Sequence, residues 1–296
     1  MNKCNICPRN CNINRALSTG FCKSTNNIKI AKVMKHFWEE PIISGENGSG
    51  TIFFSNCNLK CLFCQNYEIS SNGVGKDISK NRLITIFKEI EKSGANNINL
   101  VSPTHYSDQI ISALKEYKPS IPIIWNSNGY EKVETIQKLK NFIDIYLVDL
   151  KFFNNDLSNE ICNAKNYFDF ASKAILEMRK NQPTDIINNN IMKKGLIIRH
   201  LVLPNCTDDS IKIIDWIKNN LGLETFISIM NQYTPYYKAL NHPFLNRKVK
   251  PLEYKRVANY CINSGFKNGF LQSNESADEC YIPVFDCNFE IKNNAN

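Results

Sequence analysis

Short runs of β-branched and aromatic residues alternate along the chain with longer segments in which apolar residues recur every three or four positions. The first pattern predicts buried strands and the second predicts amphipathic helices. From about residue 50 onward, the predicted strands are 51–56, 96–102, 121–127, 144–152, 195–204 and 225–233. The predicted helices are 81–94, 106–117, 132–142, a region around 170–181, 208–220 and 251–265.

This alternation predicts six βα units and a parallel sheet, because parallel strands need crossover connections and a helix is the usual one. The polar stretch 181–195, "NQPTDIINNNIMKKG", is predicted to be a surface loop. In such an α/β architecture, reactive groups gather at the carboxyl ends of the strands.

Composition places the chain among ordinary globular proteins. Of its 296 residues, 43% are hydrophobic and 22% are charged, which argues against disorder. Apolar stretches such as 142–150 are too short to span a bilayer, and the N-terminus lacks the apolar segment of a secretory signal. We therefore expect a cytoplasmic protein without a membrane partner. The net charge of +8 is spread along the chain with interleaved signs, which is more typical of a solvated surface than of a nucleic-acid-binding one.

The twelve cysteines are many for a protein of a reducing compartment, where grouped cysteines favour metal binding or catalysis over disulfides. Two groups stand out. They are Cys57, Cys61 and Cys64, and Cys4, Cys7, Cys11 and Cys22. The other five, expected to be small buried hydrophobic residues, are Cys162, Cys206, Cys261, Cys280 and Cys287.

The group in "CNLKCLFC" has three thiols and follows the carboxyl end of the first predicted strand. A metal or cluster bound by three thiolates keeps a coordination position open, and an open position favours chemistry. The alternative is a zinc site completed by His105 or another remote residue.

The N-terminal group supplies four thiols within nineteen residues, enough for a structural zinc ion or a second iron–sulfur cluster. This segment has little apolar material of its own, so we expect a metal to organise it.

Polar residues follow or end the later strands, and we expect them to converge on one mouth. They are Ser102, Thr104, Asn126, Asn128, Asp149, Lys151, Arg199, His200, Asn231 and Gln232.

The C-x3-C-x2-C spacing, with Phe63 before the last cysteine, resembles the signature of radical S-adenosylmethionine (SAM) enzymes. The strings "GSGTIFFSNCNLKCLFCQN", "NSNGYEKVET", "DIYLVDLKF" and "NQYTPYY" resemble homologs of pyruvate formate-lyase activating enzyme that carry an extra N-terminal cysteine motif. This resemblance implies a partial (βα)6 TIM-like barrel with a C-terminal tail over residues 46–296. Residues 1–45 would form a small cysteine-rich extension and a lead-in, in which Glu39 and Glu40 are expected to be structural or solvated.

The resemblance also implies the cofactors. Cys57, Cys61 and Cys64 would hold three irons of a [4Fe-4S] cluster, and SAM would chelate the fourth. The residues implied to contact SAM are Phe63, Ser102, Thr104, Asn126, Asn128, Asp149, Lys151, Arg199 and Gln232. Asp149 and Lys151 could instead form a buried ion pair that stabilises the barrel, and "SPTH" at 102–105 stands where many members have "GGE".

The implied activity is reductive cleavage of SAM to a 5′-deoxyadenosyl radical, with flavodoxin or ferredoxin as electron donor. The radical would abstract a hydrogen atom, as in activases of glycyl radical enzymes. The alternatives are a radical SAM enzyme that modifies another peptide, a metabolite or RNA, and a non-enzymatic iron–sulfur electron carrier. An electron carrier would need neither six βα units nor a polar mouth.

Overall fold

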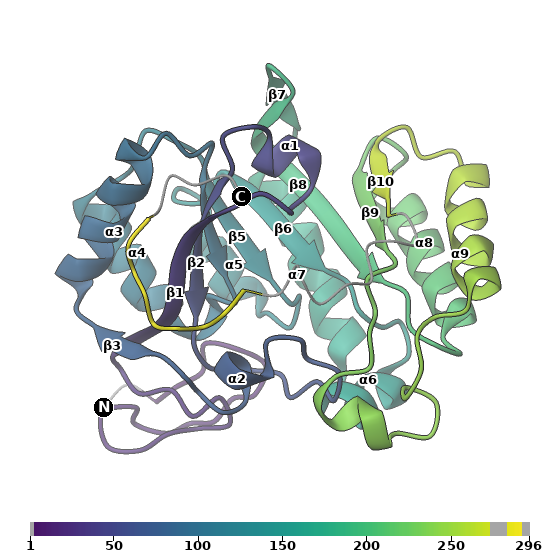
Figure 1. Ribbon diagram of the computed structural model, residues 1–296, viewed down its shortest axis with the longest axis horizontal. Coiled ribbons are helices and arrows are strands. Elements are labelled where there is room, and N and C mark those ends of the chain that lie inside the picture. The colour runs from purple at the N-terminus through teal and green to yellow at the C-terminus, as the bar shows by residue number, and fades with distance from the viewer. Residues whose placement is uncertain (1–2, 273–282, 292–296) are drawn as a thin grey trace.

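A mostly parallel sheet runs through the middle of the molecule (Figure 1), whose computed structural model describes residues 3–272 and 283–291. Six strands lie side by side in chain order and pair in parallel. They are β2 (Ser49–Phe54), β4 (Ile98–Val101), β5 (Ile123–Ser127), β6 (Ile145–Asp149), β8 (Ile191–Leu201) and β9 (Phe226–Met230). The predicted parallel (βα) architecture is therefore confirmed.

Helices cover the outer face of the sheet (Figure 1). They are α3 (Lys80–Lys92), α4 (Ser107–Glu116), α5 (Val133–Leu139), α6 (Asn155–Cys162), α7 (Tyr167–Asn181), α8 (Thr207–Leu221) and α9 (Pro251–Asn263). Each buries one apolar stripe, as α3 does with Leu83, Phe87 and Ile90. The helical region predicted around 170–181 is preceded by a separate helix, α6, which the sequence analysis missed.

The sheet does not close into a full barrel, because the strands at the two ends of the described sheet do not pair with each other. At one end β1 (Ile28–His36) pairs antiparallel with β2, and β3 (Lys76–Ile78) pairs antiparallel with β1. At the other end β10 (Gly269–Leu271) extends β9 in parallel. Residues 283–291 cross β1, where the Asn288 carbonyl accepts from the Val33 N–H at 3.3 Å and Lys32 pairs with Asp286 at 2.7 Å (Figure 1).

The prediction of a loop over 181–195 is wrong in part. β7 (Ile186–Asn188) pairs antiparallel with the beginning of β8 and forms the hairpin that projects at the top of Figure 1. Asn189 and Asn190 connect the two strands with φ values of 50° and 60°, a left-handed conformation that asparagine tolerates in hairpin turns. The hairpin was not predicted because its residues are mostly polar and exposed, as is typical of a loop.

Four short helical elements complete the described chain. They are α1 (Pro41–Ser44), α2 (Tyr67–Ser70), η1 (Thr104–Tyr106) and η2 (Tyr237–Asn241). In Figure 1, α1 and α2 lie at opposite ends of the parallel strands, with α2 at their carboxyl ends.

The scattered cysteines mostly occupy the core. Cys162, Cys206 and Cys261 are buried, as predicted. Cys287 is only half-buried, and Cys280 lies outside the described residues.

Candidate active site

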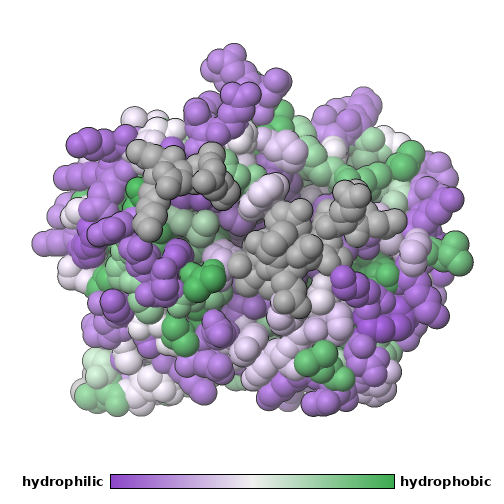
Figure 2. Space-filling view, in the orientation of Figure 1, coloured by the Kyte–Doolittle hydropathy of each residue, from purple (hydrophilic) through white to green (hydrophobic). Residues whose placement is uncertain are grey.

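A cavity of about 420 Å³ lies inside the barrel, between the parallel strands and the segment that joins β1 to α1. The predicted residues that line it are Cys61, Phe63, Cys64, Asn126, Asp149, Lys151, Arg199 and Gln232. Trp38 beyond β1 and Phe270 of β10 also line it, so the cavity reaches the two unjoined ends of the sheet. On the face seen in Figure 2, hydrophilic side chains predominate and apolar ones form small separate groups.

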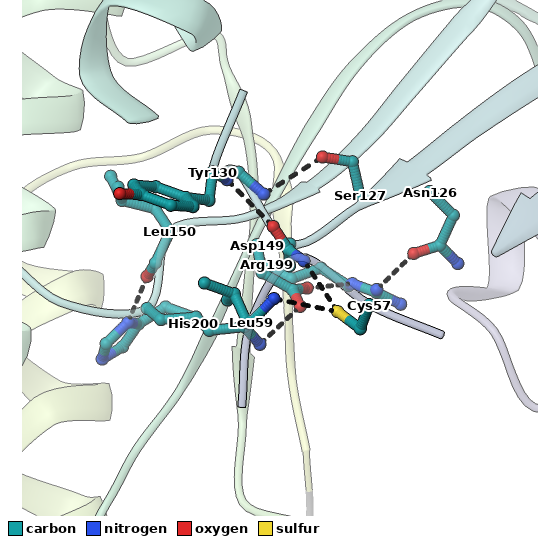
Figure 3. Close-up of polar contacts among 12 residues, drawn as sticks. Cys57, Leu59, Asn126, Ser127, Tyr130, Asp149, Leu150, Arg199 and His200 are labelled. Atoms are coloured by element: carbon teal, nitrogen blue, oxygen red, sulfur yellow. Dashed lines mark hydrogen bonds and ion pairs between the residues drawn. The ribbon is translucent and has the colours of Figure 1, made fainter. Parts of the chain in front are cut away.

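The three-cysteine loop follows β2 and is held in place by the barrel. Asn128 Nδ2 donates to Cys57 Sγ at 3.3 Å, and the Leu59 N–H donates to the same sulfur at 3.4 Å (Figure 3 shows Cys57 with Leu59). The Cys64 sulfur lies 3.1 Å from Ser70 Oγ. These hydrogen bonds lower the pKa values of Cys57 and Cys64 and so oppose part of the effect of burial.

The thiols of this loop are costly to ionise as they stand. Burial raises the pKa of Cys64 to about 12, and the charges of Cys61 and Cys57 add to the effect. The pKa of Cys57 is also raised, chiefly by burial. A hydrogen bond with Cys162, followed by burial, holds the pKa of Cys61 well above its ordinary value. A bound cation would reverse this preference, because metal binding and thiol deprotonation are coupled.

A charged network lies on the wall formed by β5, β6 and β8 (Figure 3). Arg199 Nε donates to Asp149 Oδ1 at 3.0 Å, and Lys151 Nζ donates to Asp149 Oδ2 at 2.7 Å. Burial alone would raise the pKa of Asp149, but the charges of Lys151 and Arg199 hold it below its ordinary value. Burial likewise opposes the charge of Lys151, and Asp149 raises the pKa of the lysine above its ordinary value. Both partners of this pair therefore stay charged.

The network continues to Glu39, which the sequence analysis did not place in the site. Arg199 Nη1 donates to Glu39 Oε2 at 2.9 Å, and Asn99 Nδ2 donates to Glu39 Oε1 at 2.9 Å. Arg199 Nη2 also donates to Asn126 Oδ1 at 2.7 Å. Glu40, the next residue, is buried and lines the cavity. The expectation that these glutamates are structural or solvated is therefore wrong for solvation, because both are largely buried at the cavity. A pair of acidic residues just before a proline carried no motif that could have identified them.

Three predicted SAM contacts do not line the cavity. Thr104 is buried and its hydroxyl donates to Glu131 Oε1 at 2.7 Å. The Asn128 side chain donates hydrogen bonds to Cys57 Sγ and Asn58 Oδ1. The Ser102 backbone N–H donates to the carbonyl of Asn126 in β5. His105 is a satisfied buried histidine, because Nε2 lies 2.8 Å from the Ser55 carbonyl and burial lowers its pKa to about 3. His200 and Asn231 also lie outside the cavity lining.

The four N-terminal cysteines surround a second, much smaller space. Cys4, Cys7, Cys11 and Cys22 all line one cavity of about 10 Å³. Gly20 passes so close to Cys11 that an added Cβ would lie 2.7 Å from its sulfur, and the Phe21 N–H donates to that sulfur at 3.4 Å. Burial raises the pKa of Cys7 to about 12, and the charges of Cys22 and Cys11 contribute. The four cysteines therefore lie around one small cavity, and the metal that their spacing predicts stays a prediction.

Neither set of cysteines is pre-arranged around a metal. Within residues 3–272 and 283–291, no three histidine, cysteine or acidic side chains are placed to hold a metal ion together. The donor chemistry nevertheless fits an iron–sulfur cluster, since three grouped thiols share one loop beside a polar cavity. Cys61 now shares a hydrogen bond with Cys162, which is outside the three-cysteine group.

Comparison with known proteins defines the class. The model of the radical SAM superfamily matches residues 51–217, which is more than half of the chain, and the chain belongs to this superfamily. Membership implies a [4Fe-4S] cluster and SAM as cofactors.

Two individual relatives differ in what their names say about activity. The uncharacterized protein MJ0674 of Methanocaldococcus jannaschii is 34% identical over 266 residues, covering 86% of this chain and 72% of that protein. The pyruvate formate-lyase-activating enzyme of Clostridium pasteurianum is 25% identical over 231 residues, covering 73% of this chain and 89% of that enzyme.

Solved structures support the fold alone. SuiB of Streptococcus suis matches with a TM-score of 0.50 at 16% identity, over 74% of this chain and 47% of SuiB. The [FeFe]-hydrogenase maturase HydG matches with a TM-score of 0.51 at 12% identity, over 78% of this chain and 53% of HydG. The chain thus spans about half the length of these two proteins.

The helices of the described ranges, 3–272 and 283–291, include none with both the length and the apolar character needed to cross a bilayer.

Proposed function

We propose that the protein is a radical SAM oxidoreductase that activates a glycyl radical enzyme, with Cys57, Cys61 and Cys64 as the ligands of its [4Fe-4S] cluster. The observation that carries the proposal is one cavity that brings Cys61 and Cys64 together with the charged network of Asp149, Lys151 and Arg199. When bound, the cluster and SAM supply reductive formation of a 5′-deoxyadenosyl radical able to abstract hydrogen.

The residues of the chain would bind and orient these groups. Asn128 and the Leu59 N–H would hold the Cys57 thiolate through their hydrogen bonds to its sulfur. Lys151 remains charged and can bind the carboxylate of SAM, while Asp149 can accept from its amino or hydroxyl groups. The proposed SAM contacts are those that line the cavity, Phe63, Asn126, Asp149, Lys151, Arg199 and Gln232.

Two observations favour a peptidyl substrate. The match to the pyruvate formate-lyase-activating enzyme of Clostridium pasteurianum covers most of both chains. SuiB, which shares this fold, has been solved bound to its precursor peptide SuiA. A radical SAM enzyme acting on a different peptide, a metabolite or RNA is the alternative, and a flavodoxin or ferredoxin would supply the electron in either case.

The first prediction tests the partner. Anaerobic, reconstituted protein mixed with SAM, a reductant and purified pyruvate formate-lyase should produce a protein radical that electron paramagnetic resonance detects, together with 5′-deoxyadenosine. Omitting SAM should remove both products. Formation of 5′-deoxyadenosine without a radical on the partner would count against this activase role and favour the alternative substrates.

The second prediction concerns the charged network. Asp149→Ala and Lys151→Ala should each weaken SAM binding by roughly 10- to 100-fold, because a hydrogen bond to a charged group contributes about 1.5–3 kcal/mol. Isothermal titration of the cluster-loaded protein would measure this. Lys173→Ala, on the exposed face of α7, is the matched control. If both variants bind SAM as the wild type does while unfolding at lower temperature, the pair stabilises the barrel instead.

We further propose that Cys4, Cys7, Cys11 and Cys22 bind a metal distinct from the catalytic cluster. The four cysteines line one small cavity, and four thiolates suffice for either a zinc ion or a second iron–sulfur cluster. Residues 1–45 would then be a metal-organised extension and lead-in to the core of residues 46–296, with β1 of the lead-in paired into the sheet of the core.

A further inference from the structure

Glu40 occupies an unusual position in the cavity wall. It is the residue before α1, only 8% of its surface is exposed, and it lines the cavity. Its carboxyl oxygen Oε2 has no hydrogen-bond partner within the described chain. A buried carboxyl oxygen without a partner is destabilising, which suggests that a ligand supplies the missing contact.

The neighbouring charged groups are already engaged. Both oxygens of Glu39 accept hydrogen bonds, Oε1 from Asn99 and Oε2 from Arg199. All three guanidinium nitrogens of Arg199 donate, to Asp149, Glu39 and Asn126. Among these carboxyl groups of the described residues, only Glu40 keeps an oxygen without a hydrogen-bond partner, although the Ser228 side chain lies close enough to lower its pKa. Thr234 Oγ1, which also lines the cavity, likewise has no partner in the described part of the chain, so both atoms are open to a further ligand.

Glu40 lies apart from the cysteine loop, although Arg199, one of the proposed SAM contacts, is near enough to act on its charge. The cysteine loop closes the cavity at the carboxyl ends of the parallel strands, near α2, whereas Glu40 precedes α1 at the other end of those strands (Figure 1). Ser228 of β9 and Phe270 of β10 line the cavity with Glu40. A molecule that extends from the cofactors toward the unjoined ends of the sheet would meet these three side chains.

We propose that Glu40 is a substrate-binding residue whose carboxyl group donates a hydrogen bond to the carbonyl oxygen of an uncharged amide in the substrate. This inference rests on the proposed function, because it names the group of a peptidyl substrate that the cavity recognises.

The chemistry of the wall selects this class of ligand. Burial raises the pKa of Glu40 and Glu39 adds to the shift, whereas Arg199 and a hydrogen bond from Ser228 oppose it without reversing it. A carboxyl group that keeps its proton offers one donor and one acceptor, which is complementary to the C=O and N–H of an amide. A carboxylate ligand at Glu40 would approach Glu39, which carries the same charge. An ammonium ligand would require Glu40 to ionise in a buried position.

The experiment compares three small probes in the cluster-loaded enzyme. They are N-acetylglycinamide deuterated at its glycine carbon, the equally deuterated N-acetylglycine, which is a carboxylate, and deuterated glycinamide, which is an ammonium. Deuterium transferred to 5′-deoxyadenosine measures productive binding at each concentration. The neutral amide should reach half-saturation at the lowest concentration. Equal or better use of the carboxylate or the ammonium probe would overturn the proposal.

Variants then assign the effect to the side chain. Glu40→Ala should raise the half-saturating concentration of N-acetylglycinamide about 10-fold, because it removes one hydrogen bond with a net contribution of about 1.4 kcal/mol. Glu40→Gln should restore most of this loss, because the glutamine amide can still donate a hydrogen bond. SAM affinity, measured in parallel, should change less than probe binding. Glu46→Ala, an exposed acidic residue just after α1, is the matched control. An unchanged half-saturation in Glu40→Ala, or an equal loss of SAM affinity, contradicts a substrate-binding role.

A second readout needs no turnover and separates this inference from the proposed function. Infrared difference spectra of the protein without cofactors, recorded as N-acetylglycinamide is added, should show a shift of a protonated carboxyl band that Glu40→Gln lacks. Absence of that band from the wild type would refute the assignment even if SAM is cleaved. Its presence, in a protein that makes no 5′-deoxyadenosine, would support the subsite while rejecting the radical activity.

Discussion

Replacing Cys61 by alanine is expected to abolish the formation of 5′-deoxyadenosine, with a loss of more than about 100-fold relative to the wild type. Changes in groups that only support metal ligands already cost 10- to 100-fold, and Cys61 is proposed to be a ligand itself. It lines the cavity, where the charges of Lys151 and Asp149 act on it. Iron analysis and product formation with dithionite as reductant would measure the effect.

Cys162→Ala is the matched control for this prediction. Cys162 ends α6, is fully buried, and shares a hydrogen bond with Cys61, yet it lies outside the C-x3-C-x2-C group. Its replacement should leave the iron content near the wild-type value and can make Cys61 easier to ionise, because the hydrogen bond is the first cause of the raised pKa of Cys61. A Cys61→Ala protein with wild-type iron content and activity would refute the assignment of this loop as the cluster site.

The six parallel strands could be predicted because each is a short buried run separated from the next by a helix with a regular apolar stripe. β6 illustrates this, since four of its five residues are buried on both faces of the sheet and read as a continuous apolar run. The same reasoning missed β10, which has three residues and little burial. It also missed β1, because this strand lies before the regular βα alternation and pairs antiparallel with β2.

The site was predicted where strand position determines side-chain direction. Asp149 and Lys151 flank Leu150 at the end of β6, so their common direction followed from the alternation of a strand. Thr104 lies in the short helix η1 rather than in a strand, and there its hydroxyl turns to Glu131. Glu39 and Glu40 enter the barrel from an irregular segment whose path depends on tertiary packing. No local periodicity could have placed them.

The N-terminal cysteine segment is attached to the loop that carries Cys57. Arg9 Nε donates to the Asn58 carbonyl at 2.9 Å, and its guanidinium lies 3.6 Å from the centre of the Phe21 ring. Thr135 Oγ1 donates to the Ile6 carbonyl at 2.6 Å and ties the same segment to α5. A change in the fold of this segment should therefore reach the Cys57 loop through Arg9.

Replacing Cys7 and Cys11 together by serine is expected to remove the second metal and to lower the temperature of unfolding. Four thiolates saturate a site and leave no position for SAM, so this metal has a structural or electron-relaying role, and SAM should still bind at the catalytic cluster. Elemental analysis distinguishes the two candidates, because the double variant should lose about one zinc or about four irons per chain. Cys287→Ser, a half-buried cysteine outside both groups, should lose neither. If the double variant keeps every metal and unfolds at the wild-type temperature, these cysteines are not a metal site, and the packing of Arg9 and Thr135 alone must hold the segment on the barrel.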